Sequence, residues 1–203
     1  MAELGQGHVG PLRVSIVGVG GVGSPTALLL AKHGHPLVLY DPDVVEAKNV
    51  GNQLYGPFAV GQKKVTALSI LVMAMTKICP VEEPHAVAPD TVLGTPVVIA
   101  CVDSLAARQD ILHACVGSPE PRILIDVRVG HGSIKVYAVN LGSPEQVMEY
   151  QASLAGEGMA GACIVQFEAH VAFMAAALPF VPCDTSQTLT YRGWNGCSFW
   201  MWT

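Results

Sequence analysis

Four glycines in a short segment are the first feature of this sequence that could do chemistry. The segment reads Gly18-Val-Gly20-Gly21-Val-Gly23 and follows an apolar, β-branched run. Glycine lets backbone N–H groups approach phosphate oxygens closely, and a helix that begins there adds a favourable dipole. Asp41 ends a second apolar run and could accept hydrogen bonds from ribose hydroxyls. The pattern predicts a nucleotide site, but this loop alone does not distinguish NAD from ATP.

Further polar residues extend the pattern along the chain. They are Asp41-Pro-Asp43, Asn49-Val-Gly-Asn52-Gln53, Gly61-Gln-Lys63-Lys64, Cys101-Val-Asp103 and Arg108. A lysine ammonium is a compact, mobile cation suited to phosphate. Mg²⁺ prefers carboxylate and phosphate oxygens. Taken singly, Lys64 could equally be a solvated lysine at a helix start, and Asp103 a helix-capping aspartate.

In this order, the motifs resemble the signature of the ThiF/MoeB/HesA family of ubiquitin-activating-enzyme-like adenylyltransferases, over roughly residues 12–140. That signature runs Gly-x-Gly-Gly-x-Gly-Ser, Asp-x-Asp, Asn-x-x-Arg-Gln, Gly-x-x-Lys and Cys-x-Asp. The resemblance implies ATP-dependent adenylation of a carboxylate, which gives an acyl-adenylate and pyrophosphate. The expected substrate is the C-terminal glycine of a ubiquitin-like or sulfur-carrier protein.

The resemblance also implies roles for individual residues. The nucleotide would be bound by Gly18, Gly20, Gly21, Gly23, Asp41, Asn49, Asn52, Gln53 and Lys64. Lys64 and Asp103 would be catalytic, and Asp103 would hold Mg²⁺. Catalysis of this kind depends mainly on positioning and charge neutralisation.

The sequence departs from the signature at Asn52, where the family has arginine. Arginine would place a fixed charge on the triphosphate, whereas asparagine supplies only a dipole. The segment Met1–Pro11 also contains no Arg-rich arm of the kind that completes the neighbouring site in family dimers. Arg108 or Arg128 could compensate for the missing charge. Nucleotide binding without turnover therefore stays open.

Two other functions remain as alternatives. An NAD-binding oxidoreductase could use the same glycine loop and Asp41, but it leaves Lys64 and Asp103 unassigned. A degenerate family member that acts as a dimeric scaffold is suggested by Asn52.

The later part of the chain carries two more candidate features. Asp126-Val-Arg128-Val-Gly130 and the stretch Tyr150…Leu154…Cys163 resemble segments in plasmid- and phage-encoded relatives of ThiF. Asp126 and Arg128 could equally form an ion pair at a strand end. Cys163 precedes an expected helix, whose dipole would stabilise a thiolate. It is a candidate thioester-forming nucleophile, with an inert buried cysteine as the alternative.

Strands and helices alternate along the sequence. Strands are expected at 12–18, 36–40, 85–88, 96–102, 123–127 and 133–139, and helices at 24–33, 62–79, 105–116 and from 164. The alternation predicts an α/β fold: a doubly wound, Rossmann-like, mostly parallel sheet. The tight link at 129–133 adds an antiparallel edge. The tail 187–203 could form a hairpin, and residues 155–162 read as a flexible stretch.

Composition limits the class of protein. Of the 203 residues, 51% are hydrophobic and only 13% are charged, against roughly 25% charged in an ordinary soluble domain. This balance excludes general disorder and suggests that a partner covers part of the surface, most simply a second copy in a homodimer. We expect a flexible arm over 1–11 and one nucleotide-binding domain over 12–203.

Charge and cysteine spacing exclude other classes. The net charge of −5 argues against a nucleic-acid partner. The longest charge-free runs are too short or too rich in glycine for a membrane span. The six cysteines form no Cys-x-x-Cys pair, so no zinc site is expected. Reduced thiols would be typical of the cytoplasm.

Overall fold

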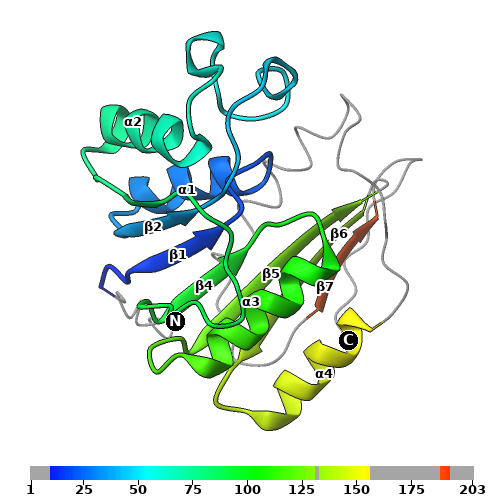
Figure 1. Cartoon of the computed structure of the whole chain (residues 1–203). Coiled ribbons are helices and arrows are strands. Elements are labelled where there is room, and N and C mark those ends of the chain that lie inside the picture. The colour runs from blue at the N-terminus through cyan, green and yellow to red at the C-terminus, as the bar shows by residue number, and fades with distance from the viewer. Residues whose placement is uncertain (1–9, 131–132, 156–187, 193–203) are drawn as a thin grey trace, which may run out of the picture.

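A seven-stranded sheet forms the centre of the computed structural model, which describes residues 10–130, 133–155 and 188–192 (Figure 1). The strand order is β3-β2-β1-β4-β5-β6-β7. The strands are β1 (Val14–Val17), β2 (Leu37–Tyr40), β3 (Val81–Glu83), β4 (Val97–Ala100), β5 (Ile123–Gly130), β6 (Ser133–Asn140) and β7 (Thr188–Arg192). The helices are α1 (Gly23–Lys32), α2 (Lys64–Thr76), α3 (Leu105–Gly117) and α4 (Pro144–Leu154), with short 3₁₀ turns η1 (Ala47–Asn49) and η2 (Pro57–Ala59).

The first five strands are parallel, and β6 and β7 extend the sheet in antiparallel fashion. The direction of winding reverses at the centre, because β1 pairs with β2 on one side and with β4 on the other. Val17 lies opposite Ala100 in the β1–β4 register, so the loops after these two strands leave the same edge together. Ligands of open α/β sheets bind at this switch point.

Alternate residues of the short central strands enter two separate cores. Ile16 and Leu39 face the cluster beneath α1 and α2, whereas Val17 and Val38 face the cluster beneath α3 and α4. All four of these side chains are buried. Such strands read as continuous apolar runs because both faces of the sheet are covered. The expected doubly wound sheet with an antiparallel edge is confirmed.

The edge of the sheet differs from expectation. The strand expected at 85–88 is wrong: β3 occupies Val81–Glu83 and pairs with β2 through Val38 and Val81. Helix α2 ends at Thr76, earlier than expected, because Lys77 adopts a left-handed conformation with φ of 67°. The helix therefore ends early enough for the extended strand β3 to begin at Val81, directly after Pro80. Val87 is buried in the core without belonging to a strand.

The C-terminal part holds one helix that the sequence pattern did not reveal. Helix α4 begins after Ser143, whose hydroxyl caps Gln146 N–H, with Pro144 at its first position. Within the tail expected to form a hairpin, 187–203, the structure describes β7, which pairs with β6. Four expected features lie outside the described residues: the rest of that tail, the arm up to residue 9, the stretch 156–162 and the helix from 164. Among the described helices, none combines the length and apolarity that crossing a bilayer requires.

Candidate nucleotide-binding site

Two of the four loop glycines pack the loop against the end of β4. Gly18 has φ of 85°, and a Cβ on it would lie 2.8 Å from the Cys101 carbonyl oxygen. A Cβ on Gly23 would overlap the carbonyl oxygen of Gly18. Gly18 N–H also donates to Tyr40 O at 2.8 Å, and Cys101 N–H to Val17 O at 2.8 Å. Glycine at these positions lets the loop fold tightly into the switch point.

The other two glycines face the segment that follows η1. A Cβ on Gly20 would meet only Gln53 Nε2, at 3.9 Å, and one on Gly21 would lie 3.3 Å from Asn52 O. The predicted motif residues Asn52 and Gln53 therefore lie against the glycine loop. Gly20 therefore leaves the loop open beside the Gln53 side chain, where its backbone could approach a phosphate, whereas Gly21 lets the loop pack against the main chain of Asn52.

Asp41 joins the end of β2 to this loop. Its Oδ2 accepts the Val19 N–H at 2.9 Å, and its Oδ1 accepts the Asp43 N–H at 2.9 Å. The side chain is buried. Burial raises the pKa of Asp41, while the nearby Lys64 charge and the two N–H donors act in the opposite direction. The sequence did not predict that Asp41 holds the loop in this way. Each carboxylate oxygen can still accept a further hydrogen bond, so a contact with a ribose hydroxyl stays possible.

Tyr55 braces the same loop from the other side. Its hydroxyl donates to Val19 O at 2.6 Å, and the residue is buried. Burial raises the pKa of Tyr55, so the hydroxyl stays protonated and remains a donor. Both main-chain polar groups of Val19 are thus satisfied by distant side chains. In the sequence, this hydrogen bond to Val19 is indicated only by Tyr55 itself, an aromatic residue in a segment rich in polar residues and glycine.

Lys64 is the first residue of α2 and is not a solvated lysine. Its side chain is 9% exposed, and Nζ lies 2.7 Å from Oδ2 of Asp43, whose side chain is 61% exposed. An ammonium group has three donors. The ion pair therefore leaves donor capacity beside Asp41 and Asp43, at the same edge of the sheet as the glycine loop.

The three predicted amide side chains differ in their contacts. Asn49 is buried, and its Oδ1 accepts the Glu46 N–H at 2.8 Å, which caps η1. By contrast, Asn52 Oδ1 and Gln53 Oε1 are buried atoms without a hydrogen-bond partner in the described structure. An unpaired buried polar atom costs about 1–3 kcal/mol. An amide can also rotate and present its N–H₂ group, so these two residues can serve either hydroxyls or phosphates.

Asp103 follows β4 and is exposed. The capping role at α3 belongs to Ser104, whose Oγ accepts the Ala107 N–H at 3.2 Å, so the helix-cap alternative for Asp103 is wrong. Within the described residues, no group of three or more His, Cys, Asp or Glu could hold a metal. Mg²⁺ commonly uses one or two carboxylates together with substrate phosphates and water. A single exposed carboxylate beside a phosphate loop fits that chemistry.

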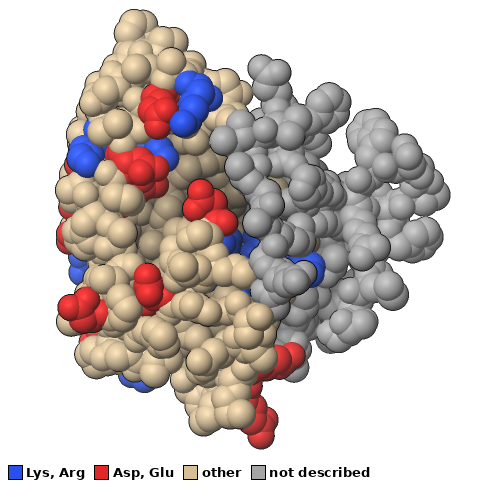
Figure 2. Space-filling view, turned by 45° about the vertical axis from the view of Figure 1, so that its right-hand side comes forward, with Lys and Arg blue, Asp and Glu red and all other residues tan. Residues whose placement is uncertain are grey.

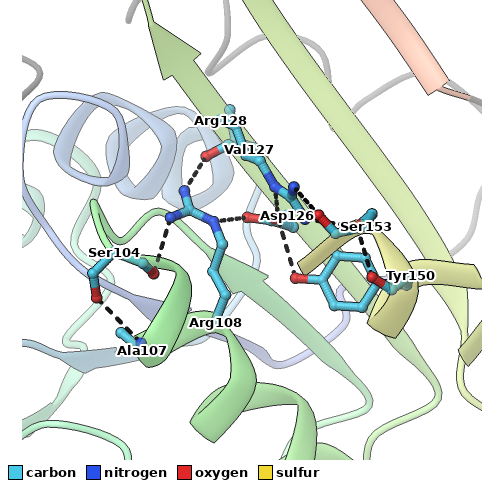
Figure 3. Close-up of polar contacts among 8 residues, drawn as sticks. All are labelled: Ser104, Ala107, Arg108, Asp126, Val127, Arg128, Tyr150 and Ser153. Carbon is cyan, nitrogen blue, oxygen red and sulfur yellow. Dashed lines mark hydrogen bonds and ion pairs between the residues drawn. The ribbon is translucent and has the colours of Figure 1, made fainter. Parts of the chain in front are cut away.

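Arg108 and Arg128 do not replace the missing family arginine. In Arg108, Nε, Nη1 and Nη2 donate to Asp126, Ser104 O and Val127 O (Figure 3). In Arg128, Nε donates to Asp126, and both Nη atoms donate to Ser153. Every guanidinium nitrogen is engaged with protein. The alternative of an Asp126–Arg128 ion pair is therefore correct, and a second arginine joins it.

The two cysteines at the switch point and in α3, Cys101 and Cys115, are poor nucleophiles. Burial, together with the Asp126 charge, raises the pKa of Cys101 to about 12. Burial alone raises the pKa of Cys115 to about 12. Both stay as thiols at neutral pH. The predicted nucleophile Cys163 lies outside the described residues.

Charged side chains are sparse on the described surface that Figure 2 shows, and acidic and basic ones adjoin each other mainly in the upper part of that view. Lys48 pairs with Glu46 at 2.8 Å on this kind of surface. Such exposed pairs contribute little to stability.

A glycine loop at the switch point of a parallel sheet, with a carboxylate at the end of the next strand, defines a Rossmann-like nucleotide-binding protein. The sequence model described as the ThiF family matches residues 1–175. The chain belongs to the ThiF family.

Curated relatives match the central part of the chain. The adenylyltransferase and sulfurtransferase MOCS3 of Mus musculus is 34% identical over 140 residues, 66% of this chain and 30% of that protein. The sulfur carrier protein ThiS adenylyltransferase of Escherichia coli (strain K12) is 34% identical over 139 residues, 63% of this chain and 53% of that protein. The chain thus spans about a third to about half of the length of the curated relatives it matches.

Solved structures share the fold. MccB of E. coli with ATP has a TM-score of 0.71 at 15% identity, covering 94% of this chain and 63% of that one. The E. coli tRNA N6-threonylcarbamoyladenosine dehydratase TcdA has a TM-score of 0.52 at 26% identity, covering 60% of this chain and 53% of that one. At 15% identity, the MccB match shows a likeness of fold alone.

Proposed function

We propose that this chain is an ATP-dependent adenylyltransferase that activates the C-terminal carboxylate of a ubiquitin-like or sulfur-carrier protein. The observation that carries the proposal is the pair of unpartnered buried amide atoms, Asn52 Oδ1 and Gln53 Oε1, in the segment whose Asn52 O and Gln53 Nε2 lie nearest to the glycine loop. Both atoms are acceptors, so a ligand with hydroxyl or amino donors would satisfy them, and a phosphate would instead accept from the amide N–H₂ groups. Family membership and the two curated relatives, both adenylyltransferases by name, support the choice of reaction.

In the proposed reaction, a carboxylate oxygen of the carrier attacks the α-phosphorus of ATP. The bond between the α-phosphorus and the bridging oxygen breaks, and pyrophosphate leaves. Backbone N–H groups of the glycine loop and the first turn of α1 would hold phosphate oxygens. Lys64 would neutralise charge on the triphosphate, and Asp41 would accept a ribose hydroxyl. Mg²⁺, held by Asp103, would supply further charge neutralisation.

The charged groups near the loop favour ATP over NAD. Lys64 keeps a largely buried ammonium next to the site, and Asp103 an exposed carboxylate. NAD carries a diphosphate without a γ-phosphate and binds without Mg²⁺, whereas a triphosphate with Mg²⁺ uses both groups. Calorimetry should therefore show binding of ATP with Mg²⁺ that is tighter than binding of NAD. Tight NAD binding with none for ATP would end the adenylation hypothesis.

Nucleotide binding without turnover is a second candidate function, and a specific observation favours it. Position 52 is neutral, and both nearby arginines are fully engaged with protein groups. ATP–pyrophosphate exchange with a carrier protein that ends in Gly-Gly separates the two functions. Exchange that depends on the carrier supports the enzyme. ATP binding without exchange supports a scaffold.

The proposal extends to assembly. Helix α2 exposes Ile70, Met73 and Met75, each about half accessible. These apolar side chains, together with the low charge content, support a homodimer. A single domain over 12–203 is supported by β7, which belongs to the same sheet as the other strands. A cytoplasmic location agrees with unpaired thiols. Sedimentation that shows only a 21.3 kDa particle at micromolar concentration would contradict the dimer.

Cys163 is proposed as the residue that accepts the activated carrier as a thioester. The test is a non-reducing gel after incubation with ATP and the carrier protein. A thiol-sensitive adduct should disappear in Cys163→Ala while pyrophosphate exchange persists. An undiminished adduct in that variant would eliminate the role.

A further inference from the structure

A buried carboxylate lies between two arginines at the end of β5. Asp126 is fully buried; its Oδ1 lies 2.7 Å from Arg108 Nε, and its Oδ2 lies 2.6 Å from Arg128 Nε. The hydroxyl of Tyr150 donates to Oδ2 at 3.1 Å. Figure 3 shows the three side chains converging on this carboxylate from α3, β5 and α4. Removing the carboxylate from such a group would leave two guanidinium charges uncompensated.

The two arginines connect the carboxylate to different parts of the fold. Arg108 Nη1 donates to Ser104 O at 3.2 Å, and its Nη2 donates to Val127 O at 3.1 Å. Arg128 instead reaches α4, where its Nη atoms contact Ser153 O at 3.3 Å and Ser153 Oγ at 3.0 Å. Arg128 also stacks on the ring of Tyr137. Arg108 therefore ties β5 to the start of α3, whereas Arg128 ties β5 to the end of α4.

The contact of Arg108 with Ser104 matters because Ser104 directly follows Asp103. Ser104 O accepts both the Arg108 guanidinium and, at 3.3 Å, the Arg108 backbone N–H. The peptide that joins Asp103 to α3 is thus held from within the core. The Asp103 side chain is exposed, and no hydrogen bond or ion pair holds its carboxylate in the described part of the chain. Its position depends on the backbone that Arg108 fixes.

We propose that Arg108 is a positioning residue for Asp103: through Ser104 O and Asp126 it fixes the start of α3, so that the Asp103 carboxylate is held where it meets Mg²⁺ on the nucleotide. The inference rests on the proposed function. A carboxylate on a rigid backbone loses little conformational entropy when it binds a cation, and partners that orient a metal ligand typically affect metal affinity 10–100-fold. Arg108 touches no substrate and acts only through Asp103.

The test measures how much Mg²⁺ tightens nucleotide binding. Calorimetry with α,β-methylene-ATP, which cannot release pyrophosphate, gives the dissociation constant with Mg²⁺ and with EDTA. The ratio of the two constants reports the cation contact, independently of turnover. Arg108→Lys keeps the charge but cannot contact Asp126, Ser104 and Val127 together. We expect the ratio to fall about tenfold, with the EDTA constant unchanged.

Arg128→Lys is the matched control, because Arg128 shares the same carboxylate but does not contact Ser104. It should lower the unfolding temperature to a similar extent while leaving the Mg²⁺ ratio at the wild-type value. An unchanged ratio in Arg108→Lys, or an equal fall in both variants, would overturn the positioning role. If Arg108→Lys does not fold, Asp126→Asn takes its place and should lower the ratio, and a wild-type ratio there overturns the inference. Wild-type protein that binds no nucleotide would instead defeat the proposed function itself.

Discussion

The carboxylate of Asp41 accepts the backbone N–H of Val19 at 2.9 Å, which joins the end of β2 to the glycine loop after β1. The bond is buried and links residues far apart in the sequence. It gives Asp41 a structural task in addition to the proposed contact with ribose. The two tasks respond differently to pH and to substitution.

The stability of the protein should depend on the ionisation of Asp41. Burial raises the pKa of this carboxyl above its unfolded value of about 3.9. The folded state therefore holds the proton more tightly, and this contribution to stability is fully present below about pH 4 and is lost as pH rises through the folded pKa. The measurement is the free energy of unfolding in urea, for wild type and for Asp41→Asn, at pH 4 and at pH 7. The difference between wild type and variant should become less favourable to wild type from pH 4 to pH 7. A difference that favours wild type more at pH 7 than at pH 4 would contradict the prediction.

Two glycine substitutions should separate folding from binding. Gly23→Ala places a methyl group against Gly18 O, so it should lower the free energy of unfolding by about 3 kcal/mol. Gly20→Ala meets no atom closer than 3.9 Å, so it should leave unfolding unchanged. The Gly20 methyl would instead occupy the open side of the loop and weaken ATP binding about tenfold or more, equal to about 1.4 kcal/mol. Normal ATP affinity in Gly20→Ala would show that the nucleotide binds elsewhere.

Asp103→Ala should remove activity without affecting folding. The carboxylate is exposed, and its capping task is carried out by Ser104. Pyrophosphate exchange should fall on the order of a hundredfold, the scale of a lost electrostatic contact in a transition state. Thermal unfolding should stay at the wild-type temperature. A variant that melts early, with activity in proportion to the folded fraction, would make Asp103 a structural residue.

Asn52→Arg should strengthen nucleotide binding. It restores the charge that the family signature has at this position, and the arginine would lie beside the glycine loop, where Asn52 O approaches Gly21. A hydrogen bond to a charged group contributes about 1.5–3 kcal/mol, so affinity for ATP should rise about tenfold. The same titration with adenosine, which lacks phosphates, is the control and should show no gain. Equal gains for both ligands would exclude a phosphate contact.

Thiol labelling should distinguish the described cysteines. Cys101 and Cys115 have pKa values raised to about 12, so they are almost entirely protonated at pH 7.5, and thiolates are the reactive form. Cys79 is exposed and should react with iodoacetamide in the folded protein. Peptide mapping by mass spectrometry, with urea-unfolded protein as the reference, gives the rate at each site. Rapid labelling of Cys101 would show that the loop opens.

Local chemistry made much of the site predictable from sequence. Glycines after one apolar run, and an acidic residue after the next, predict a phosphate loop and a carboxylate at a strand end. Both features depend on local backbone geometry, so a short stretch of sequence is enough to indicate them. The bracing of Val19 by Asp41 and Tyr55 could not be predicted, since each bond joins segments that only the fold brings together. The engagement of both arginines by Asp126 could not be predicted either, because it brings together α3 and β5. The sequence does carry a start signal for the neighbouring α4, a serine followed by a proline, which the prediction of helices did not use.

Three main-chain groups of the glycine loop, Gly18 N–H, Val19 N–H and Val19 O, have hydrogen-bond partners in Tyr40, Asp41 and Tyr55. The loop therefore loses its conformational freedom when the protein folds, and little ordering remains for the moment when a ligand arrives. Association should proceed at a rate set by diffusion and charge, with a small entropic cost at the phosphate end. The Val19 side chain adds to this rigidity, because it is fully buried in the core beneath α1 and α2.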